Sequence, residues 1–135
     1  MSSRRAITSG GPWEARFGYS RALVVGNQAF VSGTTDAGPD GRSLHPGDAS
    51  AQAMAVFSII GEALGKAGFS LADVVRTRMY VTTEEAIPIV GAVHGEVFAE
   101  VRPAATAVIV AGLIDPSLLV EIEVDAIRGA QAASG

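Results

Sequence analysis

The sequence predicts an α+β domain in which two helices pack on one face of a mixed β-sheet. Three observations predict this class: short runs of β-branched residues, two longer segments whose apolar residues recur at three- and four-residue steps, and the order ββ-α-β-α-ββ in which the segments follow one another. The chain of 135 residues has the length of one domain. We therefore expect a single domain over residues 1–135, with residues 1–12 as a flexible lead-in.

The first two strands are predicted between Arg21 and Gly33. Two β-branched runs lie here on either side of Gly26-Asn27, a pair typical of a tight hairpin turn. The segment that follows, residues 34–47, is rich in Gly, Pro, Asp and Ser, and it predicts a loop or a weak hairpin.

The first helix is predicted from Asp48 to Ala67. Asp48 can cap its start and Gly68 its end. Seven apolar residues fall on one stripe of this helix and are expected to face the core: Ala53, Val56, Phe57, Ile60, Ala63, Leu64 and Ala67. A third strand follows over residues 74–82, because polar and apolar side chains alternate there.

A second helix is predicted to begin near Glu85 or Ala86, since Pro88 is tolerated only in the first turn. Its expected core stripe is Ile89, Val93, Val97 and Val101, with Val90 and Phe98 flanking it, and Arg102-Pro103 ends it. Two apolar runs, residues 105–111 and 118–127, predict the closing strands. Because both helices cover the same face, the other face of the sheet must be buried by something else, and copies of the same chain would suffice.

Composition narrows the classes of function. A net charge of −4 and a pI of 5.0 argue against nucleic-acid binding, which needs clustered Lys and Arg. A hydrophobic fraction of 48% with a mean hydropathy of +0.33 indicates more apolar surface than a small monomer hides, and so favours self-association. The chain has no cysteine, so we expect a cytoplasmic protein without a thiolate metal site. No apolar run approaches the ~20 residues that span a bilayer, so we expect no membrane partner.

Several motifs occur in an order and spacing that make the chain resemble the Rid family, also called YjgF or reactive intermediate deaminase, from about Tyr19 to Ile127. They are Gly18-Tyr19, Phe30-Val-Ser-Gly33, Gln52, Leu64-Gly-Lys-Ala-Gly68 with Val74-Val75, Pro103-Ala104, and Val120-Glu-Ile-Glu123. The resemblance implies a chorismate-mutase-like fold and a homotrimer, with a small-molecule cleft at each subunit boundary. It also implies chemistry that needs no metal and no organic cofactor.

The resemblance further implies which residues form the cleft. Glu121 is the catalytic candidate, because the family uses a glutamate there to position water. The ligand-binding candidates are Tyr19, Ser32, Gly33, Ala105 and Ala107. In deaminating relatives, an arginine two residues after the motif proline grips the carboxylate of a 2-imino acid. This chain has Ala105 at that position, so standard 2-imino acid deaminase activity is in doubt.

The residue types alone leave other roles open. Tyr19 is also consistent with an aromatic packing residue, and Ser32-Gly33 with a turn whose hydroxyl bonds locally. Glu121 shares a strand face with Glu123 and Asp125. We interpret Glu123 and Asp125 as solvated or paired edge charges. A partly buried Glu121 would favour its protonated form, which suits general acid–base chemistry near neutral pH.

The two histidines, and two arginines of the third predicted strand, are further candidates for the site. His94 is interpreted as a boundary histidine, and with His45 in the predicted loop no metal site is expected. Arg76 and Arg78 are interpreted as solvated or subunit-pairing arginines, which replace the lost guanidinium only if their strand face reaches the cleft. Gly91 stands where relatives often carry asparagine.

Two hypotheses for function follow. The first is a trimeric enzyme or binder that acts on imine, enamine or carbonyl-like metabolites by adding water activated by Glu121. The alternative is a non-catalytic trimer that senses a ligand or binds a partner protein. The endoribonuclease or translation-inhibitor function attached to some relatives is disfavoured by the net charge of −4.

Overall fold

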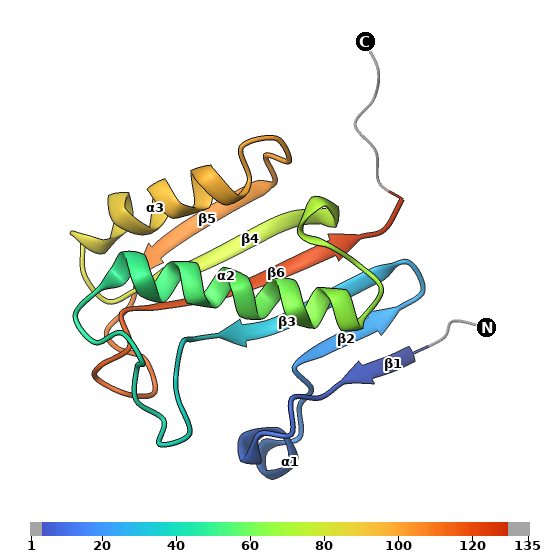
Figure 1. Ribbon diagram of the computed structural model, residues 1–135, viewed down its shortest axis with the longest axis horizontal. Coiled ribbons are helices and arrows are strands. Elements are labelled where there is room, and N and C mark those ends of the chain that lie inside the picture. Colours follow the sequence, from blue (N-terminus) through green and yellow to red (C-terminus); the bar gives the residue numbers. More distant parts are fainter. Residues whose placement is uncertain (1–3, 130–135) are drawn as a thin grey trace.

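The computed structural model describes residues 4–129, which form one mixed sheet with two long helices on one of its faces (Figure 1). The sheet has six strands in the order β1-β2-β3-β6-β4-β5. The elements are β1 (Arg4–Ile7), α1 (Pro12–Phe17), β2 (Ala22–Val25), β3 (Gln28–Thr34), α2 (Ala49–Lys66), the 3₁₀ helix η1 (Leu71–Asp73), β4 (Val74–Val81), α3 (Ala86–Val97), β5 (Ala104–Ile109) and β6 (Val120–Ile127). The predicted α+β class, mixed sheet and helix arrangement are confirmed.

Strand β6, drawn in red in Figure 1, lies in the middle of the sheet although it comes last in the chain. It pairs antiparallel with both β3 and β4, whereas β4 and β5 are parallel because α3 carries the chain back between them. The interpretation of Glu123 and Asp125 as solvated or paired edge charges was wrong about the sheet edge, whereas both residues are paired, with Arg78. They lie on a central strand, opposite Arg78 and Arg76 of β4.

The core lies between the sheet and the helices α2 and α3. All seven apolar residues predicted for the first helix stripe are buried. In α3 the helix begins at Ala86 as predicted, and Pro88 lies in its first turn. The predicted stripe was wrong at Ile89, which is 42% exposed, because the stripe that faces the core runs through Ala86, Val90 and Val93 and leaves Ile89 beside it on the exposed side.

The N-terminal segment differs from the flexible lead-in that was predicted for residues 1–12. Residues Arg4–Ile7 form β1, which pairs antiparallel with β2, and Ile7 joins the core. Arg5 also donates hydrogen bonds to the carbonyl oxygens of Lys66 and Ala67 at the end of α2, at 3.4 and 2.9 Å. The N-terminal segment is thus held by the edge of β2 and by these carbonyl oxygens, which the sequence of the segment alone does not reveal. Residues 1–3 lie outside the described residues.

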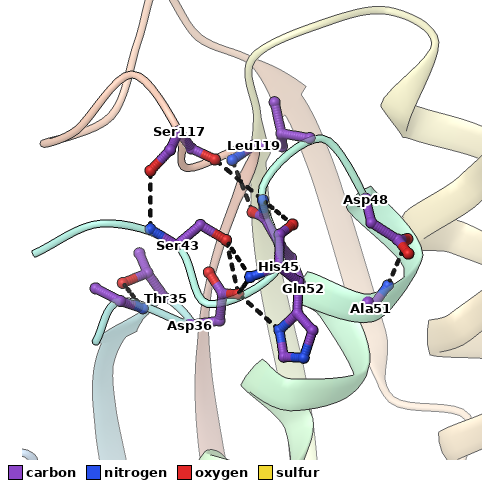
Figure 2. A network of polar contacts seen from close by, with 10 residues as sticks. Thr35, Asp36, Ser43, His45, Asp48, Ala51, Gln52, Ser117 and Leu119 are labelled. Atoms are coloured by element: carbon purple, nitrogen blue, oxygen red, sulfur yellow. Dashed lines mark hydrogen bonds and ion pairs between the residues drawn. The ribbon is translucent and has the colours of Figure 1, made fainter.

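The connection between β3 and α2, predicted as a loop or weak hairpin, is closed by an isolated bridge between Ala37 and Ser43 and is organised around Asp36 (Figure 2). The Asp36 side chain is 1% exposed. Its carboxylate accepts hydrogen bonds from the Ser43 hydroxyl at 2.8 Å and from the His45 backbone N–H at 3.2 Å, and it lies 3.0 Å from His45 Nδ1. All of these contacts go to Oδ2 and replace the water that this oxygen has lost, whereas Oδ1 is buried without a hydrogen-bond partner among residues 4–129.

Gln52 of α2 ties this loop to the segment that precedes β6 (Figure 2). Its side chain is fully buried, and its Nε2 donates to the carbonyl oxygens of His45 and Ser117 at 3.1 and 3.0 Å. Its Oε1 accepts from the backbone N–H of Leu119 at 2.8 Å. One glutamine thus holds the two connections at this end of the sheet in a fixed relation.

Candidate functional site

Glu121 lies near the start of β6 and points to the sheet face that carries no helix, because its neighbours Val120 and Ile122 fill the core on the other face. Its carboxylate rests against the backbone of Gly33 on β3. A Cβ built on Gly33 would lie 2.0 Å from Glu121 Oε2 and 3.1 Å from its Cδ. The pairing of β3 with β6 shifts register between Val31 and Thr34, which places Gly33 beside the carboxylate. Glycine at this position is therefore what leaves room for Glu121.

A hollow of about 320 Å³ opens beside this carboxylate. Its lining contains two carboxylates and a phenol, from Glu121, Glu123 and Tyr80, but neither Lys nor Arg among the described residues. The lining residues are Gly33, Tyr80, Val110, Gly112, Leu113, Glu121 and Glu123. The Tyr80 hydroxyl donates a hydrogen bond to Glu123, and this bond raises the pKa of Tyr80.

The surroundings of Glu121 shift its pKa in opposite directions. Burial raises the pKa of the Glu121 carboxyl, and the neighbouring carboxylate of Glu123 raises it further, whereas the Arg21 guanidinium lowers it. Arg78 of β4 pairs with Glu123 at 3.9 Å and with Asp125 at 3.4 Å. Glu121 thus has an environment that brings a carboxyl closer to proton exchange near neutral pH, as a general acid or base requires.

Tyr19 and Ser32 line a second hollow on the same face, of about 450 Å³, which shares Glu123 with the first. Tyr19 is 42% exposed, so its ring is available to a ligand or to another subunit. The Ser32 hydroxyl donates to the carbonyl oxygen of Ser20 at 2.7 Å, which is the local bond that the turn interpretation expects.

Ala105 and Ala107 are not brought together with Glu121 within the described chain. Both lie exposed on the edge strand β5, and β4 separates them from β6. They are aligned with Thr77 and Met79, whose side chains are buried on the helix side of the sheet. Neither alanine lines either hollow.

His94 lies on the opposite side of the sheet from Glu121. Its Nε2 is 2.8 Å from the Thr77 hydroxyl oxygen, its ring packs against Phe57 and Phe98, and burial lowers its pKa. This is the environment of a boundary histidine in the core. Among residues 4–129, no group of three or more His, Asp and Glu side chains is arranged to hold a metal ion, and no helix there is long and apolar enough to cross a membrane.

Sequence reasoning missed Arg21, which it used only to mark the start of a strand. Arg21 Nη2 donates to the carbonyl oxygen of Gly33 at 2.5 Å, and its Nε is buried without a hydrogen-bond partner within residues 4–129. Burial lowers the pKa of this guanidinium. Its alternation with Ala22 and Leu23 was the one signal that placed it on the open face.

The fold and the two hollows define a class of small α+β domain whose helix-free sheet face presents a carboxylate-lined, ligand-sized site. Residues 12–128 match the family model described as Endoribonuclease L-PSP. The crystal structure of Rv2704 from Mycobacterium tuberculosis, a member of the YjgF/YER057c/UK114 family, matches with a TM-score of 0.84 at 45% identity, over 93% of this chain and 99% of that one. The chain belongs to this family, which is the Rid or YjgF family that the sequence motifs indicated.

Two curated relatives carry names that state an activity. The 3-aminoacrylate deaminase RutC of Acinetobacter baylyi is 36% identical over 104 residues, which cover 77% of this chain and 82% of the relative. The 2-iminobutanoate/2-iminopropanoate deaminase of Rattus norvegicus is 30% identical over 137 aligned positions, which cover 100% of this chain and 99% of the relative.

Proposed function

We propose that the protein is a hydrolytic deaminase of small imines or enamines whose substrate has no tightly held α-carboxylate. The observation that carries this proposal is the Glu121 carboxylate, raised in pKa by burial, in a hollow that Glu123 and Tyr80 also line. The names of the relatives from Acinetobacter baylyi and Rattus norvegicus support deamination as the reaction type.

The chemistry needs one group that exchanges protons and a site that stabilises positive charge. Glu121 accepts a proton from water as the water oxygen bonds to the imine carbon, and the C=N π electrons move to nitrogen. Starting from the protonated imine, this addition gives a carbinolamine, and the same carboxyl then gives its proton to the carbinolamine nitrogen. The C–N bond breaks and ammonia leaves as the hydroxyl oxygen forms the C=O bond and releases its own proton to the carboxylate or to solvent. Glu123 adds a second negative charge beside the hollow, which favours the protonated imine, the more electrophilic form.

The charge of the hollow also argues against a 2-imino acid as the preferred substrate. Ala105 stands where the family's arginine would grip the carboxylate, and the hollow beside Glu121 is lined by Glu and Tyr without Lys or Arg among the described residues. A bidentate guanidinium–carboxylate pair contributes about 1.5–3 kcal/mol, so its loss weakens binding of a 2-imino acid by roughly ten- to a hundred-fold.

We further propose that the functional unit is a homotrimer in which a neighbouring copy covers the helix-free face. Leu23, Phe30 and Val108 lie on that face, and the last two are 40% and 41% exposed. Ala105 and Ala107, expected in the cleft from the resemblance, lie on the edge strand and would reach a site only from a neighbouring subunit. A neighbouring copy would account both for the exposed apolar side chains on this face and for the position of the two alanines on the edge strand.

The test is hydrolysis of carboxylate-free imines, generated from primary amines by a flavin amine oxidase and followed by ammonia release. The wild type should accelerate ammonia release, and Glu121→Gln should lose about 100-fold or more of that acceleration. Glu62→Gln, on the exposed side of α2, is the matched control and should behave as wild type. Thermal stabilisation by substrate analogues without any acceleration would instead support the non-catalytic binder.

A further inference from the structure

Arg21 and Glu121 both contact Gly33. Arg21 Nη2 holds the carbonyl oxygen of Gly33 at 2.5 Å, and the carboxylate of Glu121 lies against the Cα of Gly33. Gly33 itself belongs to the irregular stretch of β3 between Val31 and Thr34, where the ladder with β6 is interrupted. A backbone segment without its regular ladder bonds is held in place by such side-chain bonds.

Other charged groups lie on the same face, among them Arg4 of β1, which lines the second hollow with Glu123 and Asp125. Glu123 lies on the same strand as Glu121, and Arg78 from β4 is paired with Glu123 and Asp125. Tyr80 bonds to Glu123, while Tyr19 and Glu14 face Arg21 from the α1 side. Arg21 is therefore the cation whose field acts on Glu121 itself, and it lowers the pKa that burial and Glu123 raise.

Arg21 acts on Glu121 without binding it directly. Within residues 4–129 the two side chains form no ion pair of 4.0 Å or less, in contrast to Arg78 with Asp125 at 3.4 Å. A direct pair would fix the charge of Glu121 and occupy the oxygen that exchanges the proton. A nearby cation bonded to the backbone instead leaves the carboxylate free.

We propose that Arg21 is a positioning residue for Glu121: it fixes the Gly33 backbone on which the carboxylate rests, and it holds a positive charge beside that carboxylate. The inference rests on the proposed function, in which Glu121 exchanges the proton. Ala105 replaces the family's arginine in this site, and Arg21 provides a different cation. This cation keeps Glu121 ionised, so that Glu121 can act as a base.

The decisive measurement is the titration of the Glu121 carboxyl carbon by ¹³C NMR in the full chain, which does not depend on turnover. Arg21→Gln should raise the pKa of Glu121 by about 0.5–1 unit, because it removes the cation. Arg21→Lys keeps the charge and should leave the pKa within about 0.3 unit of wild type. Arg16→Gln is the charge-matched control on α1, and it should leave the titration of Glu121 unchanged.

The two roles of Arg21 are separated by these variants. If Arg21→Gln moves the pKa of Glu121 no further than Arg16→Gln does, Arg21 only supports the backbone and the inference is overturned. If Arg21→Gln does not fold, Arg21→Met, which retains the apolar stem, supplies the neutral variant for the same comparison. In the imine assay the acid limb of the rate profile should move to higher pH in the neutral variant. A wild type without turnover contradicts the proposed function, whereas the NMR titration still decides the role of Arg21.

Discussion

Substitution of Gly33 by alanine tests the assignment of Glu121 through geometry alone. The added Cβ would lie 2.0 Å from Glu121 Oε2, whereas real contacts of this kind are not shorter than 3.0 Å, so the carboxylate must move by about 1 Å or more. Displacement of a catalytic group by ~1 Å costs up to about a hundred-fold in rate. We expect Gly33→Ala to lower kcat/KM for imine hydrolysis by about ten- to a hundred-fold.

The stability of the Gly33→Ala protein should change much less than its activity. The backbone of Gly33 does not adopt a positive φ, so alanine is tolerated there, and the cost of about 1–2 kcal/mol comes from moving one partly exposed side chain. Gly65→Ala is the matched control, because nothing lies within 4 Å of a Cβ at Gly65. It should keep full activity and gain up to about 1 kcal/mol from helix propensity. Retention of wild-type kcat/KM by a folded Gly33→Ala protein would refute the catalytic assignment.

Four further predictions concern the charge, assembly and partners of the protein. Ala105→Arg should raise activity toward small 2-imino acids, supplied by a flavin amino-acid oxidase, by about ten-fold or more, if the restored guanidinium–carboxylate pair contributes ~1.5–3 kcal/mol to binding. A wild type whose deaminase activity already equals that of an arginine-bearing relative would contradict this. Glu121 has a raised pKa in the folded state, so its contribution to stability is present below its ordinary pKa and is lost as pH rises through the raised value. Glu121→Gln should therefore raise the urea midpoint relative to wild type more at pH 8 than at pH 4, and an equal change at both would refute the raised pKa. Light scattering at micromolar concentration should give the mass of a trimer, and a monomer mass would overturn the proposed assembly. Filter binding should show negligible RNA affinity at physiological salt because the net charge is −4, and a salt-resistant complex would contradict that expectation.

The sequence predicted those parts of the fold that repeat a strong local pattern. The helix stripe from Ala53 to Ala67 was predicted in full, because buried residues recur along several turns. Strand β1 was missed, since Arg4–Ile7 has no alternation and is held by partners distant in the chain. Ile89 was misplaced because it and Val90 are adjacent apolar residues, and either one continues the spacing of Val93 and Val97 at three- or four-residue steps.

The candidate site was predictable only where family motifs mark it. Glu121 and Gly33 come from such motifs, although their mutual contact depends on the register shift between β3 and β6. Arg21 carries no motif, and its position beside Gly33 follows from strand pairing that a single sequence does not specify. For Ala105 the structure describes an edge strand, so its part in the site depends on assembly.

The central position of β6 also affects how the protein is made. During synthesis β3 and β4 exist before β6, and each then presents an unpaired edge that invites pairing with other chains. Insertion of β6 closes both edges at once and carries Glu121 to Gly33 in the same event. A chain in which β6 has not yet inserted therefore lacks the contact between Glu121 and Gly33, and the step that completes the proposed site also covers the edges of β3 and β4 that face β6.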